Sequence, residues 1–171
     1  MVTPSGTFDP VDIPITAGCA NSGPAPNVVG LNTLLLSASS GPVPDIVALG
    51  ATTGNDGIVN VAGANGQGAF AVATVNVGIT ADITASADTG GASLPVAINL
   101  CQTNPGTGQC TSVTGQTVTT TIAANGTPTF AIFLQGSGNV PFDPAHNRIF
   151  VRFKDGGGVV RGATSVAVRT Q

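Results

Sequence analysis

The chain has 171 residues, of which 42% are apolar and 8% charged, about a third of the charged share of an ordinary globular protein. Its 24 glycines and 12 prolines suit many short strands and exclude long helices. All five basic residues lie between Arg148 and Arg169, whereas residues 1–147 carry seven aspartates and no positive charge. This basic set is too small for a nucleic-acid binder, and no apolar run reaches the roughly 18 residues of a membrane-spanning helix.

The first predicted element is a β-hairpin over residues 8–38, because this stretch is a degraded copy of the C-terminal end. Residues 8–19 match 142–153, and residues 30–36 match 162–168 after a two-residue adjustment. The matched pairs include Phe8 with Phe142, Ile15 with Ile149, Ala17 with Val151, Cys19 with Phe153, Leu34 with Val166 and Leu36 with Val168. We interpret residues 1–40 as the terminal hairpin of a preceding repeat unit. By this match Cys19 is inward, and we expect a buried apolar side chain rather than a reactive thiol.

The middle of the chain shows the same pattern of short strands and turns after a polar, proline-containing connector. Strands are predicted over 45–49, 58–61 and 69–77, separated by Asn-Asp-Gly and Gly-Ala-Asn-Gly turns. The stretch 65–78 matches 125–138 at an offset of 60, and 83–98 follows the pattern of the C-terminal hairpin. A unit of four to six strands leaves one apolar face uncovered, so units must pair face to face or stack. Residues 41–171 are therefore predicted to form one antiparallel β-sandwich from two related half-units, about 41–100 and 101–171.

Cys101 and Cys110 bracket the loop Gln-Thr-Asn-Pro-Gly-Thr-Gly-Gln, whose Asn-Pro-Gly is a turn signal. Two sulfurs at this spacing can meet across a hairpin, which favours a disulfide. Two free thiols are the alternative, while a metal site would need more Cys or His nearby. A disulfide would imply an oxidising compartment, namely the periplasm, the cell surface or the medium.

The last predicted element is a hairpin over residues 142–169. Ile149, Val151 and Phe153 alternate with more polar neighbours, so we expect these three side chains to point inward. Asp-Gly-Gly-Gly at 155–158 supplies the turn, because glycine accepts the positive φ of a reversal. The outward side is a candidate binding or assembly face, consisting of Arg148, Phe150, Arg152, Lys154, Arg161 and Arg169.

The sequence contains no recognisable catalytic constellation. His146 follows Asp143, but no turn presents a nucleophile, and the chain has no Glu, Trp or Tyr for a glycosidase site. The densest oxygen sets for calcium are Asp9 with Asp12 and Asp143 with Asn147, both short of a calcium motif. We therefore expect no enzyme, no catalytic residue and no metal or other cofactor, with calcium as the minor alternative.

Two stretches carry a resemblance to known proteins: TFAIFLQGSGNVPFDPAHNRIFVRFKDGGGVVRGATSVAVRTQ and ASLPVAINLCQTNPGTGQC. They resemble the Ig-like repeat regions of large secreted or surface-attached bacterial proteins. The resemblance implies an Ig-like sandwich and a non-catalytic stalk or spacer, sometimes with adhesive modules. Because the chain has no Trp, the Cys…Trp…Cys core of antibody domains is absent and the likeness is to the sandwich.

We therefore expect a structural module (stalk, spacer or assembly unit) of a bacterial extracellular or cell-surface protein. One alternative is a fibre or pilus-like subunit that assembles by strand complementation. Another is an adhesive module that binds an acidic glycan or protein through the basic C-terminal hairpin. Expected partners are neighbouring repeat units or copies of the chain, without nucleic acid or membrane insertion. The N-terminal hairpin is expected either to fold back in a closed monomer or to complete the sandwich of an adjacent chain.

Overall fold

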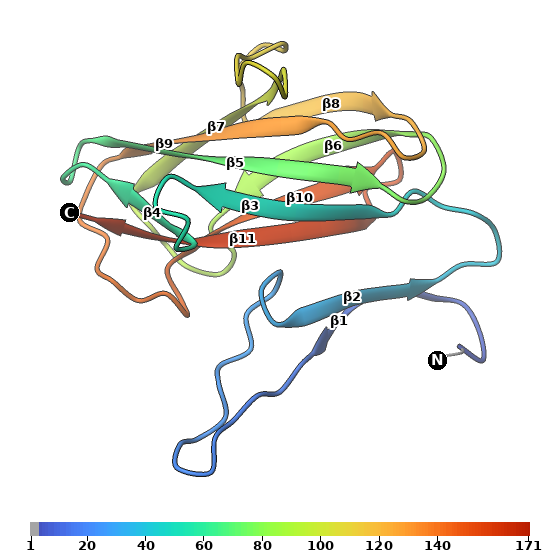
Figure 1. The fold of residues 1–171 in the computed structure, drawn as a ribbon, viewed down its shortest axis with the longest axis horizontal. Coiled ribbons are helices and arrows are strands. Elements are labelled where there is room, and N and C mark those ends of the chain that lie inside the picture. The colour runs from blue at the N-terminus through green and yellow to red at the C-terminus, as the bar shows by residue number, and fades with distance from the viewer. Residues whose placement is uncertain (1–3) are drawn as a thin grey trace.

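A computed structural model describes residues 4–171, which form eleven β-strands and no helix (Figure 1). The strands are β1 (Phe8–Pro14), β2 (Thr33–Ala38), β3 (Ile46–Thr52), β4 (Ile58–Val61), β5 (Gln67–Asn76), β6 (Ala81–Asp88), β7 (Val96–Thr103), β8 (Thr117–Ile122), β9 (Thr129–Gly136), β10 (Arg148–Asp155) and β11 (Val160–Thr170). Among these residues there is accordingly no helix with the length and hydropathy to cross a membrane.

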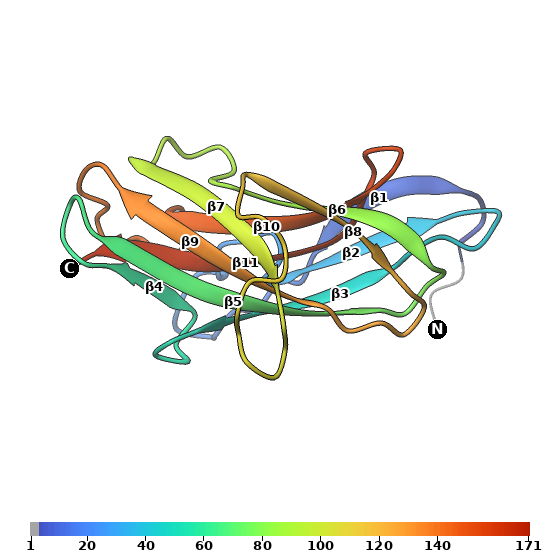
Figure 2. The same ribbon diagram turned by 90° about the horizontal axis from the view of Figure 1, so that it is seen from above.

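Strands β3 to β11 form a sandwich of two sheets (Figures 1 and 2). One sheet has the order β3-β5-β9-β7 and the other β4-β11-β10-β6-β8. The prediction of an all-β fold is confirmed. The expectation of purely antiparallel pairing is wrong at one place, because β4 pairs with β11 in parallel. The chain changes sheets between β3 and β4 and so reaches the edge beside β11 running in the same direction.

The core lies between the two sheets and contains the predicted inward residues of the C-terminal hairpin. Ile149, Val151 and Phe153 on β10 are fully buried. The ring of Phe153 packs against that of Phe130 on the opposite sheet, with 5.4 Å between the centroids. Period-two alternation thus places the apolar side chains of each sheet on the face that the other sheet covers.

The stretch 83–98 differs from its predicted hairpin. β6 and β7 belong to different sheets, so the turn between them is a crossover and not a hairpin connection. β6 already pairs on one side with β10 and on the other with β8. Because both of its edges are occupied, β7 can pair only in the other sheet, where β9 receives it.

The two stretches related by the offset of 60 are direct neighbours. They form β5 and β9, which pair antiparallel with Ala71 opposite Ala131. The hydrogen bonds at the two ends of this pair correspond: Asn76 N–H donates to Gly126 O over 3.0 Å, and Gly136 N–H donates to Gly66 O over 2.9 Å. A local two-fold axis between β5 and β9 therefore relates each residue of one stretch to its match, 60 residues away, in the other.

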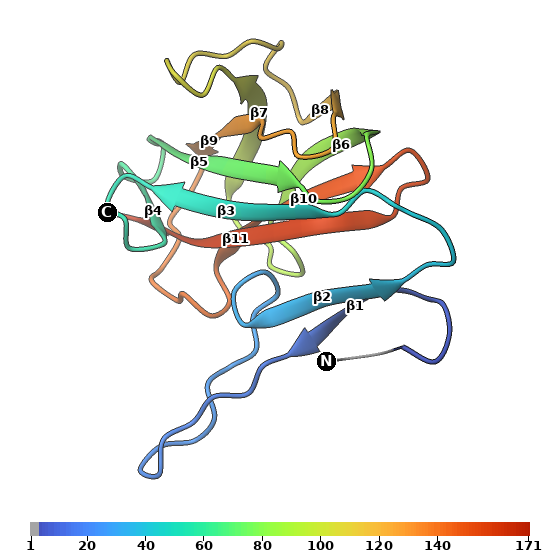
Figure 3. The same ribbon diagram turned by 45° about the vertical axis from the view of Figure 1, so that its right-hand side comes forward.

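The N-terminal hairpin is present, but its first strand differs from the prediction. β1 and β2 pair antiparallel as a separate two-stranded sheet beside the sandwich (Figures 1 and 3). β1 ends at Pro14, so Ile15 and Cys19 lie in the following loop and both are exposed. The expectation of a buried Cys19 is therefore wrong. Prolines and glycines over 18–26 interrupt any continuing strand, which is why the copy does not extend as far as its C-terminal counterpart.

Candidate functional site

The candidate basic face does not form one surface, and Arg148 differs most from its predicted position. This side chain was expected to point outward but is buried. Its Nε donates to Ser165 Oγ over 3.0 Å, its Nη2 to Ser165 O over 3.0 Å and its Nη1 to Pro144 O over 2.7 Å. Burial lowers the pKa of the guanidinium. Neutral oxygens therefore satisfy the donors of a buried cation.

The cover over this region comes from the N-terminal segment 25–32. Ser165 Oγ donates to Val29 O over 3.0 Å, and Val28 is buried. Gly30 lies so close to β11 that an added Cβ would sit 3.0 Å from the Thr164 backbone. Asn32 holds this turn, since its Oδ1 accepts from Val28 N–H over 2.6 Å. The packing of segment 25–32 against β11 was not predicted from the sequence, although the Asn- and Gly-containing turn in this segment was a signal of it.

Two other arginines of the face are paired with carboxylates. Arg152 Nε lies 2.8 Å from Asp88 Oδ2, and Arg161 Nε lies 2.6 Å from Asp155 Oδ2. Burial by itself would raise the pKa of both aspartates, but the hydrogen bonds from these arginines and from backbone N–H groups hold each pKa below its ordinary value. Phe150 is half-buried with the Arg152 guanidinium 5.1 Å from its ring centroid. These charges are therefore compensated within the chain.

Lys154 and Arg169 are the remaining basic residues of the face. Arg169 Nε donates to Asn60 Oδ1 over 2.7 Å, and its guanidinium lies 5.1 Å from the ring centroid of Phe142. Neither cation forms a salt bridge with a carboxylate within residues 4–171. The structure thus aligns Arg148, Phe150, Arg152 and Lys154 on one strand but leaves little uncompensated charge there.

The predicted disulfide between Cys101 and Cys110 is present, with 5.6 Å between the Cα atoms. Cys101 is buried although it alternates with core-facing Leu100, because the loop 104–116 covers the outward side of β7. This loop also pairs with the strand edge: Leu100 N–H donates to Gly115 O over 2.7 Å, and Thr111 N–H donates to Gln102 O over 2.8 Å. It projects beyond β7 in Figures 1 and 2. A disulfide indicates an oxidising compartment.

His146 and Asp143 form an exposed hydrogen-bonded pair in the loop before β10. His146 Nδ1 lies 2.9 Å from Asp143 Oδ2, and this hydrogen bond is the main reason that the pKa of Asp143 lies below its ordinary value. None of the hydroxyl groups described bonds to His146, so the pair lacks the nucleophile of a triad. Asp12 Oδ1 accepts from Thr33 Oγ1 over 2.9 Å within the N-terminal hairpin. Across the part of the chain that the structure describes, no group of three metal-ligating side chains occurs.

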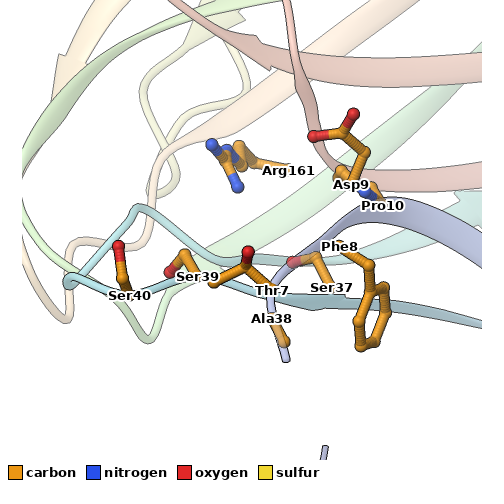
Figure 4. A pocket seen from close by; sticks show the side chains of 9 residues that line it. All are labelled: Thr7, Phe8, Asp9, Pro10, Ser37, Ala38, Ser39, Ser40 and Arg161. Carbon is orange, nitrogen blue, oxygen red and sulfur yellow. The ribbon is translucent and has the colours of Figure 1, made fainter. Parts of the chain in front are cut away.

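Two hollows lie between the N-terminal part and the sandwich. The first has a volume of about 410 Å³ and is lined by residues 7–10, residues 37–40 and Arg161 (Figure 4). The second, of about 720 Å³, runs between segment 25–32 and the neighbouring strands β3 and β11. Hydroxyls dominate the first lining and apolar side chains the second. Arg161 in the first hollow is paired with Asp155, and the donors of Arg148 in the second are bonded to Ser165 and Pro144.

The feature that sequence analysis missed most completely is the outward face of the four-stranded sheet. No residue of β3, β5, β7 or β9 is charged. The outward positions are mostly small and apolar: Val47, Leu49, Ala51, Ala69, Ala71, Ala73, Ala97, Ala131 and Phe133. We call these nine residues the neutral face. The sequence shows that each of these four strands is uncharged. Only the sheet order shows that the four strands lie side by side.

A comparison with models of known protein families and a comparison with curated proteins returned no match to this chain. The functional interpretation therefore rests on the geometry of residues 4–171.

Proposed function

We propose that the chain is a non-catalytic structural module, a stalk or spacer, of a bacterial extracellular or cell-surface protein. The observation that carries the proposal is the parallel pairing of Ile58–Val61 on β4 with the end of β11. It joins an early strand of the sandwich to its last strand. The disulfide supports an extracellular location, because such bonds persist in oxidising compartments.

Parallel strands near the two ends of the sandwich resist tension along the chain. A pull on the N-terminal side draws β4 backward along its axis, while a pull on the C-terminus draws β11 forward. The hydrogen bonds between them, including Ala167 N–H to Gly57 O at 2.8 Å and Gln171 N–H to Val61 O at 3.1 Å, then carry the force together. Bonds that are loaded together rather than one after another require more force to break. This arrangement suits a spacer under tension.

The strand order supports an Ig-like sandwich. Strands β3, β5, β6, β7, β9, β10 and β11, taken as A to G in chain order, give sheets A-B-E-D and C-F-G. That is the order of the constant-type immunoglobulin sandwich, to which β4 and β8 add the two edges of the second sheet. The two-fold relation of β5 and β9, and the match of residues 8–38 to the C-terminal hairpin, support a tandem repeat origin. On this proposal the partners are neighbouring repeat units or copies of the chain.

Single-molecule force spectroscopy tests the spacer proposal. Pulled from its two ends, the chain should first lose the β1–β2 hairpin at low force, because the force separates its bonds one after another. The sandwich should then unfold in one step at a force several-fold higher. The matched control pulls the same protein from its N-terminus and from Gly157→Cys, in a Cys19→Ser background. Gly157 lies in the turn between β10 and β11, and Gly162 near the start of β11 lies against Ile46 at the start of β3, so this pull separates the strands instead of shearing them. Equal forces in the two directions would overturn the proposal.

Assembly by strand complementation is the second candidate, and the exposure of the N-terminal hairpin favours it. Val11, Ile13 and Leu34 are all exposed, and β1 and β2 pair only with each other among the strands described. Light scattering on the full chain and on a chain that begins at Val43 distinguishes the two cases. Strand exchange requires the full chain to associate and the shorter chain to be monomeric or unfolded.

Adhesion to an acidic glycan is the weaker alternative, because only Lys154 and Arg169 of the basic face are neither buried nor paired with a carboxylate. Retention on an immobilised acidic polysaccharide at low salt tests it. Retention that disappears in a Lys154→Gln, Arg169→Gln variant would favour adhesion over the spacer role. A chain that elutes with the void at low salt would exclude this mode of binding.

A further inference from the structure

The distribution of charge divides the sandwich into two unlike sheets. All five basic residues of the chain lie on β10 and β11, and Asp82, Asp88 and Asp155 lie on β6 and β10. The four strands of the other sheet contain no charge at all. In an ordinary antiparallel sheet with one solvated face, each strand alternates apolar residues toward the core with polar residues toward water. The neutral face therefore lacks the usual means by which a solvent-facing sheet stays apart from other proteins.

The outward side chains of this sheet are also exposed and apolar. Leu49 is 69% exposed, Val47 48% and Phe133 38%. Most remaining outward positions are alanines, including Ala71 and Ala131 where β5 and β9 pair. Alanines leave a low, even surface that another sheet can approach closely. The β1–β2 hairpin lies beside the sandwich near β11 and leaves this face uncovered (Figures 1 and 3).

We infer that the neutral face is a self-association surface, and that its partner is the same face of a second copy of this chain. A partner with charged side chains would have to bury them against a surface that offers no opposite charge, which is unfavourable. The same face of a second copy brings no charged side chain. The polar residues at its margins, such as Gln67, Asn99 and Gln135, have amides that both donate and accept hydrogen bonds, so like can pair with like. The inference goes beyond the proposed spacer role and does not depend on it.

The size of the face fits a reversible dimer. Four strands spaced about 4.8 Å apart, each about 25 Å long, present about 500 Å² per copy. Two copies would bury about 1,000 Å², which is below the range of stable interfaces and within that of weak, transient ones. We therefore expect dissociation constants between about 1 μM and about 1 mM.

The disulfide loop determines how two copies can lie on one another. This loop stands on the outward side of β7, at one edge of the sheet, and its Val113 is 89% exposed. Val47 and Leu49 lie on β3, at the opposite edge. A two-fold axis parallel to the strands would place β7 of each copy over β3 of the other. Val113 would then contact Leu49 of the second copy at both rims, so that the two most exposed large apolar side chains described, at 89% and 69%, become covered.

Analytical ultracentrifugation of the full chain over a range of concentrations tests the inference, with Cys19→Ser to exclude random disulfides. Wild type should be a monomer–dimer mixture. Ala71→Arg places a cation at the centre of both faces and should weaken the dimer at least tenfold. Thr117→Arg is the matched control, because it adds the same charge to an exposed position on β8 in the other sheet. Circular dichroism should show that both variants keep the wild-type fold.

Cross-linking tests the two-fold arrangement. Leu49→Cys and Val113→Cys proteins, mixed and treated with a short bismaleimide, should form a mixed dimer that Ala71→Arg abolishes. A wild-type chain that stays monomeric at about 1 mM would overturn the inference. So would an Ala71→Arg protein that dimerises as well as Thr117→Arg, because association would then use another surface, such as the N-terminal hairpin. A dimer that Ala71→Arg disrupts but that yields no Leu49–Val113 product would overturn the two-fold placement.

Discussion

Replacement of Phe153 by alanine should remove a large part of the stability of the sandwich. The side chain is fully buried on β10, and its ring lies 5.4 Å from that of Phe130 on the other sheet. Truncation loses the buried ring and leaves a cavity between the sheets, which in protein cores costs about 3 to 5 kcal/mol. With an unfolding slope of about 2 kcal/mol per molar urea, the midpoint should fall by about 2 M.

Far-UV circular dichroism is the appropriate probe, because the chain contains neither Trp nor Tyr. Phe153→Leu keeps part of the volume and should cost about 1 to 2 kcal/mol, which gives a measurable value even if the alanine variant does not fold. Phe150→Ala is the matched control on the neighbouring position of β10. Its ring is half-buried and contacts the Arg152 guanidinium, so its loss should cost about 1 kcal/mol. Equal losses for Phe153→Ala and Phe150→Ala would refute the inward and outward assignment of β10.

Three further predictions follow from the contacts of single side chains. Cys110→Ser should lower the free energy of unfolding by about 2 to 3 kcal/mol, since the disulfide closes a loop of about ten residues, whereas Cys19→Ser should have no effect on the urea midpoint. Arg148→Lys should cost about 2 to 4 kcal/mol in the same assay, because an ammonium cannot reach Ser165 Oγ, Ser165 O and Pro144 O together; a loss no larger than that of Lys154→Gln would contradict the buried network. The lowered pKa of Asp155 means that its ion pair stabilises the fold above an unfolded-state pKa of about 3.9 and that this contribution is lost as the pH falls below it. Asp155→Asn should therefore show a smaller fall in urea midpoint between about pH 5 and about pH 2 than wild type does, and an unchanged fall would assign the acid sensitivity to other groups.

Local signals in the sequence were sufficient for the fold class and for several individual positions. The alternation of Ile149, Val151 and Phe153 predicted their burial, because successive side chains of any strand point to opposite faces whatever the strand pairs with. The spacing of Cys101 and Cys110 across an Asn-Pro-Gly turn predicted their disulfide, because both the turn and the closure involve only neighbouring residues.

Only the tertiary structure decided which residues distant in the chain contact one another. Periodicity says that a strand has two faces but not which strand lies beside it, so neither the parallel β4–β11 pair nor the crossover from β6 to β7 could be read from it. Arg148 is buried because the segment around Val29 folds across β11, and Arg152 is neutralised by Asp88, which lies 64 residues earlier. The neutral face exists because the sheet order places four separate uncharged strands side by side. Sequence by itself thus determined which residues of β10 turn toward the core, whereas the pairing of distant strands determined which outward residues are covered, compensated or left exposed.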